Sequence, residues 1–105
     1  MNAEEKSFLR NLCRMCFVKY QIVNSAPMIS ALISQVCRIK NLDVPSVDGI
    51  LHVKIGDRTL QYSHCFNIYH GNIIDASIYQ FAIMNSSIKE LFPKIVVGDD
   101  IDEIE

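Results

Sequence analysis

The stretch that decides the fold lies at residues 59–79, which read TLQYSHCFNIYHGNIIDASIY. Along Thr59–Tyr69 the pattern alternates, with the period of two expected for a β-strand. The side chains that share one side of this strand are Leu60, Tyr62, His64, Phe66 and Ile68. Residues 70–72 (His-Gly-Asn) predict a turn, and Ile73–Tyr79 predicts a second strand. The stretch therefore predicts an antiparallel hairpin.

Two helices are predicted ahead of this hairpin. In residues 3–20, apolar side chains recur at spacings of three and four, and Glu4 and Glu5 suit the positive end of the helix dipole. Residues 24–27 (Asn-Ser-Ala-Pro) end that helix and begin another, because Asn and Ser cap helices and Pro is tolerated in a first turn. The second helix ends near Ile39, and its apolar stripe comprises Ile29, Leu32, Ile33, Val36 and Cys37.

The remaining elements complete a small sheet. Residues 41–49 contain Pro, Asp and Gly and predict a loop, whereas Ile50–Ile55 predicts a strand. Further on, Ser87–Glu90 has the form of a capping box and predicts a short helix that Pro93 stops, and Lys94–Val97 predicts an edge strand. We therefore expect an α+β fold in which helices pack on one face of a small antiparallel sheet.

Length and charge indicate one domain with a short tail. The chain has 105 residues, half of them hydrophobic, which suffices for a single core. Residues 98–105 hold five acids and no base, whereas residues 1–97 hold ten bases and seven acids. The net charge of −2 therefore divides between a mildly basic α+β domain, residues 1–97, and an acidic C-terminal tail, residues 98–105.

These features argue against several classes of protein. Lysine and arginine occur without a run of three, so we expect no nucleic-acid partner. No apolar stretch approaches ~20 residues, so we expect no membrane span, and the acidic start is unlike a secretory signal. We expect a cytoplasmic protein with reduced thiols. Cys13 and Cys16 form a single C-x-x-C pair, which is too little for a zinc site, and we expect neither metal nor cofactor.

His64 and Asp75 are the residues of the hairpin best suited to chemistry. A two-residue loop at His70-Gly71 makes them diagonal neighbours on one face of the sheet, and a four-residue loop places them opposite each other. A three-residue loop sends them to opposite faces. A carboxylate beside an imidazole fixes the tautomer that a general base needs. The pair is therefore a candidate for acid–base catalysis, and its alternative is an ordinary strand histidine with an aspartate that caps a turn.

The order of these parts resembles the transglutaminase-like (papain-like) superfamily of cysteine enzymes, over roughly residues 24–79. In that superfamily the catalytic thiol lies at the N-terminus of a core helix, the histidine lies on a strand, and the acid lies on the next strand before Pro, Ala or Ser. The matching residues here are His64-Cys65-Phe66, Asp75-Ala76-Ser77 and the helix that begins at Ala26. The resemblance implies a minimal transglutaminase-like core.

The resemblance also implies a thiol-dependent hydrolase or acyltransferase that acts on an amide or peptide bond through a Cys-His-Asp triad. In this triad His64 would take the thiol proton and Asp75 would orient His64. Gln21, upstream of Ala26, is a candidate for the oxyanion site, and its alternative is a surface position at a helix end. The expected partner is the substrate, an amide of a peptide or protein, and the alternative is a partner protein that completes the site. The alternative function is a non-catalytic protein-binding or adaptor module of phage or bacterial type.

Ala26 stands where the superfamily has its nucleophile. A helix N-terminus suits a thiolate, because the helix dipole and free N–H groups lower a thiol pKa, but alanine has no thiol. Three explanations stay open. The cysteine has been replaced in an inactivated mutant, the protein is a natural pseudoenzyme that keeps the pocket for binding, or the alignment differs and Ser25 or a thiol elsewhere is the nucleophile.

Overall fold

The structure, a computed structural model, describes residues 1–20, 24–98 and 100–102. Its elements are α1 (Ala3–Lys19), α2 (Ala26–Ile39), β1 (Ser46–Ile55), β2 (Arg58–Tyr69), β3 (Asn72–Asp75), α3 (Gln80–Met84), the 3₁₀ helix η1 (Ser86–Leu91), β4 (Ile95–Val97) and β5 (Asp100–Asp102). The described strands form one antiparallel sheet in the order β1-β2-β3-β4-β5. The predicted α+β fold is confirmed.

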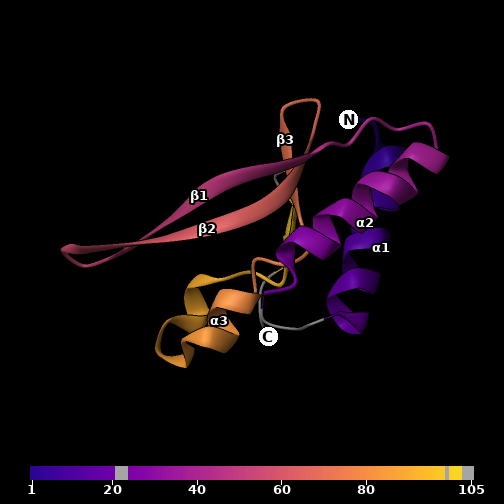
Figure 1. The fold of residues 1–105 in the computed structure, drawn as a ribbon. Coiled ribbons are helices and arrows are strands. Elements are labelled where there is room, and N and C mark those ends of the chain that lie inside the picture. Colours follow the sequence, from indigo (N-terminus) through magenta and orange to yellow (C-terminus); the bar gives the residue numbers. More distant parts are fainter. Residues whose placement is uncertain (21–23, 99, 103–105) are drawn as a thin grey trace.

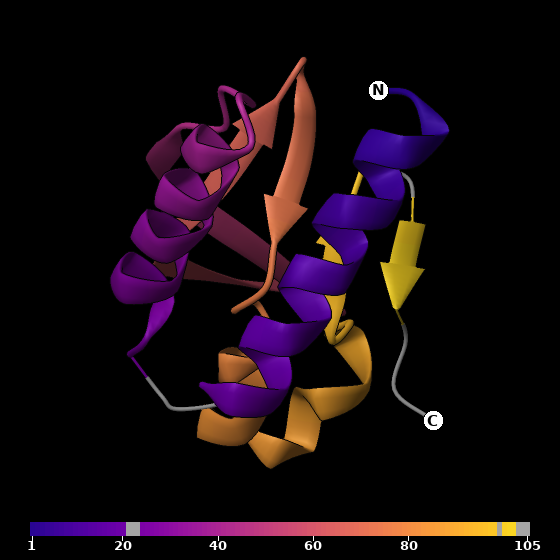
Figure 2. The same cartoon turned by 90° about the vertical axis from the view of Figure 1, so that its right-hand side faces the viewer.

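The elements are arranged around two apolar clusters. Figures 1 and 2 show α1 and α2 side by side over one face of the sheet, while the β1–β2 hairpin projects away from them. Between these helices and the sheet lies the main core: Leu9, Leu12, Cys13, Cys16, Ile29, Ile33, Cys37, Val44, Tyr69, Ile74, Ala76, Ile95 and Val97. Under the projecting hairpin, α3 and η1 form a second cluster: Val53, Phe81, Ala82, Ile88 and Phe92.

Both N-terminal helices are confirmed. α1 begins after Asn2, whose side chain accepts a hydrogen bond from the Glu5 N–H (2.8 Å), while the Glu5 carboxylate accepts one from the Asn2 N–H (3.0 Å). This reciprocal capping satisfies two N–H groups that a helix start otherwise leaves unpaired. α2 has Pro27 in its first turn, as predicted, and its N-cap residue Ser25 makes no side-chain capping bond.

β1 begins earlier than the sequence predicts. The strand starts at Ser46 rather than Ile50. The prediction that residues 46–49 belong to the loop was therefore wrong. Ser46 lies opposite Asn67 of β2, and the thiol of Cys65 donates a hydrogen bond to the Asp48 carboxylate across the same pair of strands (2.9 Å). Pairing with β2 therefore overrides the local preference of Pro, Asp and Gly for a loop.

The β2–β3 turn has two residues, because Tyr69 lies opposite Asn72. His70 and Gly71 both have positive φ, +50° and +78°. Two left-handed residues are typical of the tight hairpin turn whose twist matches that of the flanking strands. Of the three registers considered for the hairpin, the structure adopts the one that makes the candidate histidine and aspartate diagonal neighbours.

β3 is shorter than predicted, and a helix follows it. The strand ends at Asp75 rather than Tyr79. The carboxylate of Asp75 turns the chain, since its Oδ1 accepts hydrogen bonds from the Ser77 N–H (3.0 Å) and hydroxyl (3.4 Å). The chain then enters α3, which was not predicted because a five-residue helix leaves too short a pattern.

The C-terminal elements correct two further predictions. The short helix is the 3₁₀ helix η1, and its cap is Asn85 rather than Ser87, since the Asn85 side chain accepts hydrogen bonds from the Ser87 N–H (3.3 Å) and hydroxyl (2.6 Å). β4 is not an edge strand, because β5 pairs with it. Residues 100–102 of the acidic tail therefore belong to the sheet.

Candidate functional site

His64 and Asp75 form a direct and buried contact. His64 lies in the middle of β2, Asp75 is the last residue of β3, and the distance from Nε2 to Oδ2 is 2.6 Å. Their exposed fractions are 5% and 3%. The structure thus brings these two predicted site residues together, and their catalytic role stays a prediction.

Strand alternation directs this pair away from α2. Asn67 of β2 faces α2, because its Nδ2 donates a hydrogen bond to the Ser30 carbonyl oxygen (2.9 Å). His64 lies an odd number of positions from Asn67, so its side chain points to the opposite face of the sheet. Asp75 likewise follows Ile74, which is buried in the core under the helices.

Aromatic rings enclose the His64 imidazole. The Phe66 ring lies nearly parallel to it at 6.0 Å between centroids, and the Phe81 ring of α3 meets it edge-on at 5.2 Å. These rings keep water from the imidazole and strengthen its hydrogen bond to the carboxylate, because polar contacts are stronger in a less polar surrounding. Sequence reasoning missed Phe81, since α3 itself was missed.

The second nitrogen of His64 has no hydrogen-bond partner among the residues that the structure describes. This nitrogen, Nδ1, is buried. Where the carboxylate is ionised it can only accept hydrogen bonds, so Nε2 carries the hydrogen of this contact, and in a neutral ring Nδ1 then keeps a lone pair. A buried acceptor without a partner costs about 1–3 kcal/mol. A general base likewise has one nitrogen held by a carboxylate and the other free of partners, but here Nδ1 is buried as well.

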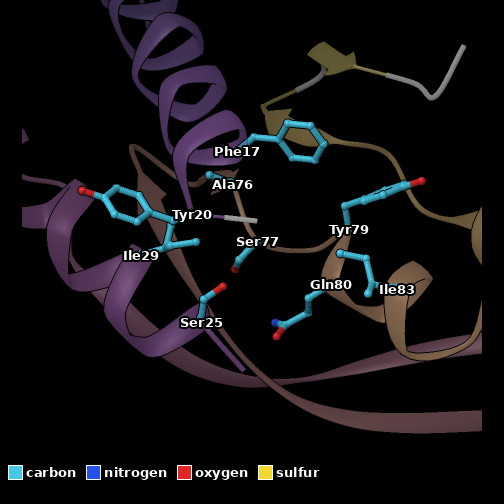
Figure 3. Close-up of a pocket in the computed structure, with 9 residues that line it drawn as sticks. All are labelled: Phe17, Tyr20, Ser25, Ile29, Ala76, Ser77, Tyr79, Gln80 and Ile83. Atoms are coloured by element: carbon cyan, nitrogen blue, oxygen red, sulfur yellow. The ribbon is translucent and has the colours of Figure 1, made fainter. Parts of the chain in front are cut away.

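The segment after Asp75 touches the N-terminus of α2. Figure 3 shows Ser25, Ser77 and Gln80 around a small cavity of about 10 Å³, which has room for one water molecule at most. The side-chain oxygen of Gln80 accepts a hydrogen bond from the Asn24 N–H (2.8 Å), and Asn24 has the left-handed φ of +68°. The start of α2, at Ala26, is therefore held against the chain that carries Ser77 and Gln80.

Ala26 is buried at the first position of α2, with 4% of its surface exposed. Its methyl group offers neither a nucleophile nor a proton. Gln21, the predicted oxyanion residue, lies outside the described residues. Gln80 is the amide that the structure attaches to the start of this helix, and sequence reasoning missed it because its partner, Asn24, is 56 positions away.

No family model, curated protein or solved structure matches this chain. Among the described helices, none is long and apolar enough to cross a membrane. The function therefore has to be argued from the chemistry of the site.

The thiols of the chain are not activated for nucleophilic attack. Burial raises the pKa of Cys13 and of Cys16, and it raises the pKa of Cys37 to about 11. The hydrogen bond from Cys65 to Asp48, together with partial burial, raises the pKa of Cys65 to about 11. A thiol with a raised pKa holds little thiolate at neutral pH.

The described residues also contain no cluster of His, Cys, Asp and Glu that could hold a metal ion.

The face that carries His64 and Asp75 also carries a cavity of about 210 Å³. Besides this pair, the residues that line the cavity are apolar: Ile50, Leu51, Phe66, Ile73, Ile78 and Val96. An apolar cavity with a few convergent polar groups is the usual form of a small binding site. The buried pair is therefore reached from a surface that suits an apolar group.

Proposed function

We propose that this chain carries the acid–base part of a thiol-dependent amide hydrolase or acyltransferase, with Ala26 at the position of the nucleophile. The observation that carries the proposal is the buried contact between His64 and Asp75, with Nδ1 of His64 left unpaired. The order of helix, histidine strand and acid strand, which resembles transglutaminase-like enzymes, supports it.

The proposed reaction needs a thiol at position 26 and a rearrangement that brings this thiol within reach of His64, because the His64 side chain points to the face of the sheet opposite α2. This thiol gives its proton to Nδ1 of His64 and attacks the carbonyl carbon of the amide, while Asp75 keeps the imidazole oriented. The imidazolium then returns the proton to the leaving amine, and an acyl-thiol remains. Transfer of the acyl group to water or to another amine completes hydrolysis or acyl transfer.

Binding without turnover is the second candidate function. It is favoured by the present residue at position 26, alanine, and by the raised pKa of the free thiols. In this case the chain is a small protein-binding module whose site keeps the geometry of an enzyme. Both candidate functions use His64 and Asp75. They differ in whether His64 would take the proton from a thiol placed at position 26.

The variant Ala26→Cys tests the proposal. We expect iodoacetamide to modify Cys at position 26 at least tenfold faster than Cys65 near pH 7, because the helix dipole lowers a thiol pKa and the proposed function has His64 accept the thiol proton. Peptide mass spectrometry after short reaction times gives both rates in one sample. Cys65 is a suitable internal reference, since its pKa is about 11.

Two further variants separate activation by His64 from simple exposure of a new thiol. Adding His64→Ala to Ala26→Cys is expected to slow the modification at least tenfold. Moving the thiol by one residue, in Ser25→Cys, tests the alternative alignment in which residue 25 is the nucleophile. The proposal is wrong if the thiol at position 26 reacts no faster than Cys65, or if its rate does not change when His64 is removed.

A further inference from the structure

The cavity beside His64 and Asp75 has a definite chemical character. Six aliphatic or aromatic residues line it, and among the residues that the structure describes no lysine, arginine or glutamate does. Within the described part of the chain, the ionisable groups on its wall are His64 and Asp75, which are hydrogen-bonded to each other. A charged ligand group would therefore lose its hydration without gaining an opposite charge.

The cavity fits one large apolar group. A volume of about 210 Å³ exceeds that of the apolar protein cavities of roughly 150 Å³ that are known to take up benzene. Ile73, which lines it, remains 48% exposed. Covering this exposed aliphatic surface would be favourable in water, so an apolar group that fills the cavity is stabilised by the burial of both partners.

A glycine shapes the wall of the cavity. Gly49 of β1 lies directly opposite His64 in the register of the sheet. A Cβ atom at position 49 would lie only 2.8 Å from Cε1 of the Phe66 ring. Phe66 therefore occupies the space that any other residue at position 49 would fill, and the ring forms both a wall of the cavity and a cover for the imidazole.

We infer that this cavity binds the uncharged, branched or aromatic side chain of a peptide whose amide lies at the His64–Asp75 pair. This inference rests on the proposed function for the choice of a peptide amide. It adds a specificity: leucine-like or phenylalanine-like residues next to the amide are preferred over alanine and over charged residues.

Blocked amino-acid amides test the inference on the unaltered full chain. With the isoleucine δ1-methyl groups labelled with ¹³C, N-acetyl-leucinamide should shift the signals of Ile73 and Ile78 saturably. N-acetyl-alaninamide and the negatively charged N-acetyl-aspartamide should bind at least tenfold more weakly. The methyl group of Ile39, which is 85% exposed at the end of α2, serves as a reference outside the cavity.

A matched pair of surface variants checks the location. Ile73→Ser should weaken the binding of N-acetyl-leucinamide at least fivefold, whereas Ile39→Ser should leave it unchanged. Both residues have substantial solvent exposure, so neither change should prevent folding. The inference is overturned if the leucine and alanine amides bind equally, if no saturable shift occurs at the cavity residues, or if Ile39→Ser weakens binding as much as Ile73→Ser.

The outcomes separate this inference from the proposed function. Binding is measured with alanine at position 26, so it does not depend on a nucleophile. Selective binding together with an unreactive thiol at position 26 would support the proposed binding cavity and would reject the proposed enzymatic function. An activated thiol without selective binding would retain the enzyme and reject the cavity as a specificity pocket.

Discussion

Gln80 is a buried amide whose oxygen accepts a hydrogen bond from the Asn24 backbone, across 56 residues of sequence. Asn24 is one of three non-glycine residues with positive φ in the described chain, and such a conformation needs support from its surroundings. Gln80 supplies that support at the entry to α2. It is therefore a positioning residue for the start of this helix and does not itself contact the His64–Asp75 pair through a hydrogen bond.

The variant Gln80→Ala is expected to lower the free energy of unfolding by about 0.5–1.5 kcal/mol, because the part-buried hydrogen bond from the Asn24 N–H to Gln80 is lost. Urea denaturation measures the change. Gln61→Ala is the matched control, since Gln61 is exposed on β2 and its loss should cost at most about 0.5 kcal/mol. Gln80→Glu keeps an acceptor oxygen and should recover part of the loss. Equal stabilities of the two alanine variants would contradict this role of Gln80.

Gly49 is constrained by the Phe66 ring rather than by its own backbone. Gly49→Ala places a methyl group 2.8 Å from Cε1 of Phe66, so we expect a loss of about 1–3 kcal/mol in the free energy of unfolding from overpacking. The same substitution in a Phe66→Leu background should cost less, because the smaller side chain frees that space. A penalty that is equal in both backgrounds would show that the Phe66 ring is not its cause.

At the scale of elements, a side-chain bond ties α1 to β2. The Tyr69 hydroxyl donates a hydrogen bond to the Glu5 carboxylate. This bond, together with the Asn2 backbone N–H, lowers the pKa of Glu5 below its ordinary value of 4.5. The folded state therefore prefers the ionised form of Glu5. The resulting stability is present above about pH 4.5 and is lost as the pH falls through the lower pKa of the folded state.

The variant Tyr69→Phe is expected to destabilise the protein near neutral pH and to do so less at low pH. The difference in unfolding free energy between Tyr69→Phe and the unaltered chain, followed by urea denaturation from about pH 7 to about pH 3, should shrink on acidification. This pH dependence should vanish in a Glu5→Gln background and persist in a Glu4→Gln background. A difference that stays constant over the whole range would contradict the link between α1 and β2.

At the scale of the whole molecule, hydrophobic periodicity in the sequence predicts the long helices and strands. The short elements and the ends of the strands depend on tertiary contacts. α1, α2 and β2 were predicted because each repeats its period over ten or more residues. β1 was predicted too short and β3 too long, because their ends depend on Asn67 across the sheet and on the hydrogen bonds from Ser77 to Asp75. Short elements such as α3 and β5 leave too few residues for a pattern to show.

The candidate site divides in the same way. His64 and Asp75 are named by the sequence, and their meeting required only the two-residue turn between β2 and β3. Phe81 and Gln80 enter the surroundings of the site through tertiary contacts that no local pattern encodes. Position 26 is identified by resemblance alone, so its role stays a prediction.

The state of the His64 imidazole tests the central claim most directly. In the ¹⁵N-labelled unaltered chain, long-range ¹H–¹⁵N spectra taken where the rings are neutral should show the hydrogen of His64 on Nε2 and none on Nδ1. The exposed His52 and His70 supply the reference for rings that exchange freely between tautomers. Asp75→Asn should abolish the fixed preference of His64. A His64 ring that carries its hydrogen on Nδ1, or that averages as His52 and His70 do, would contradict a base held by Asp75.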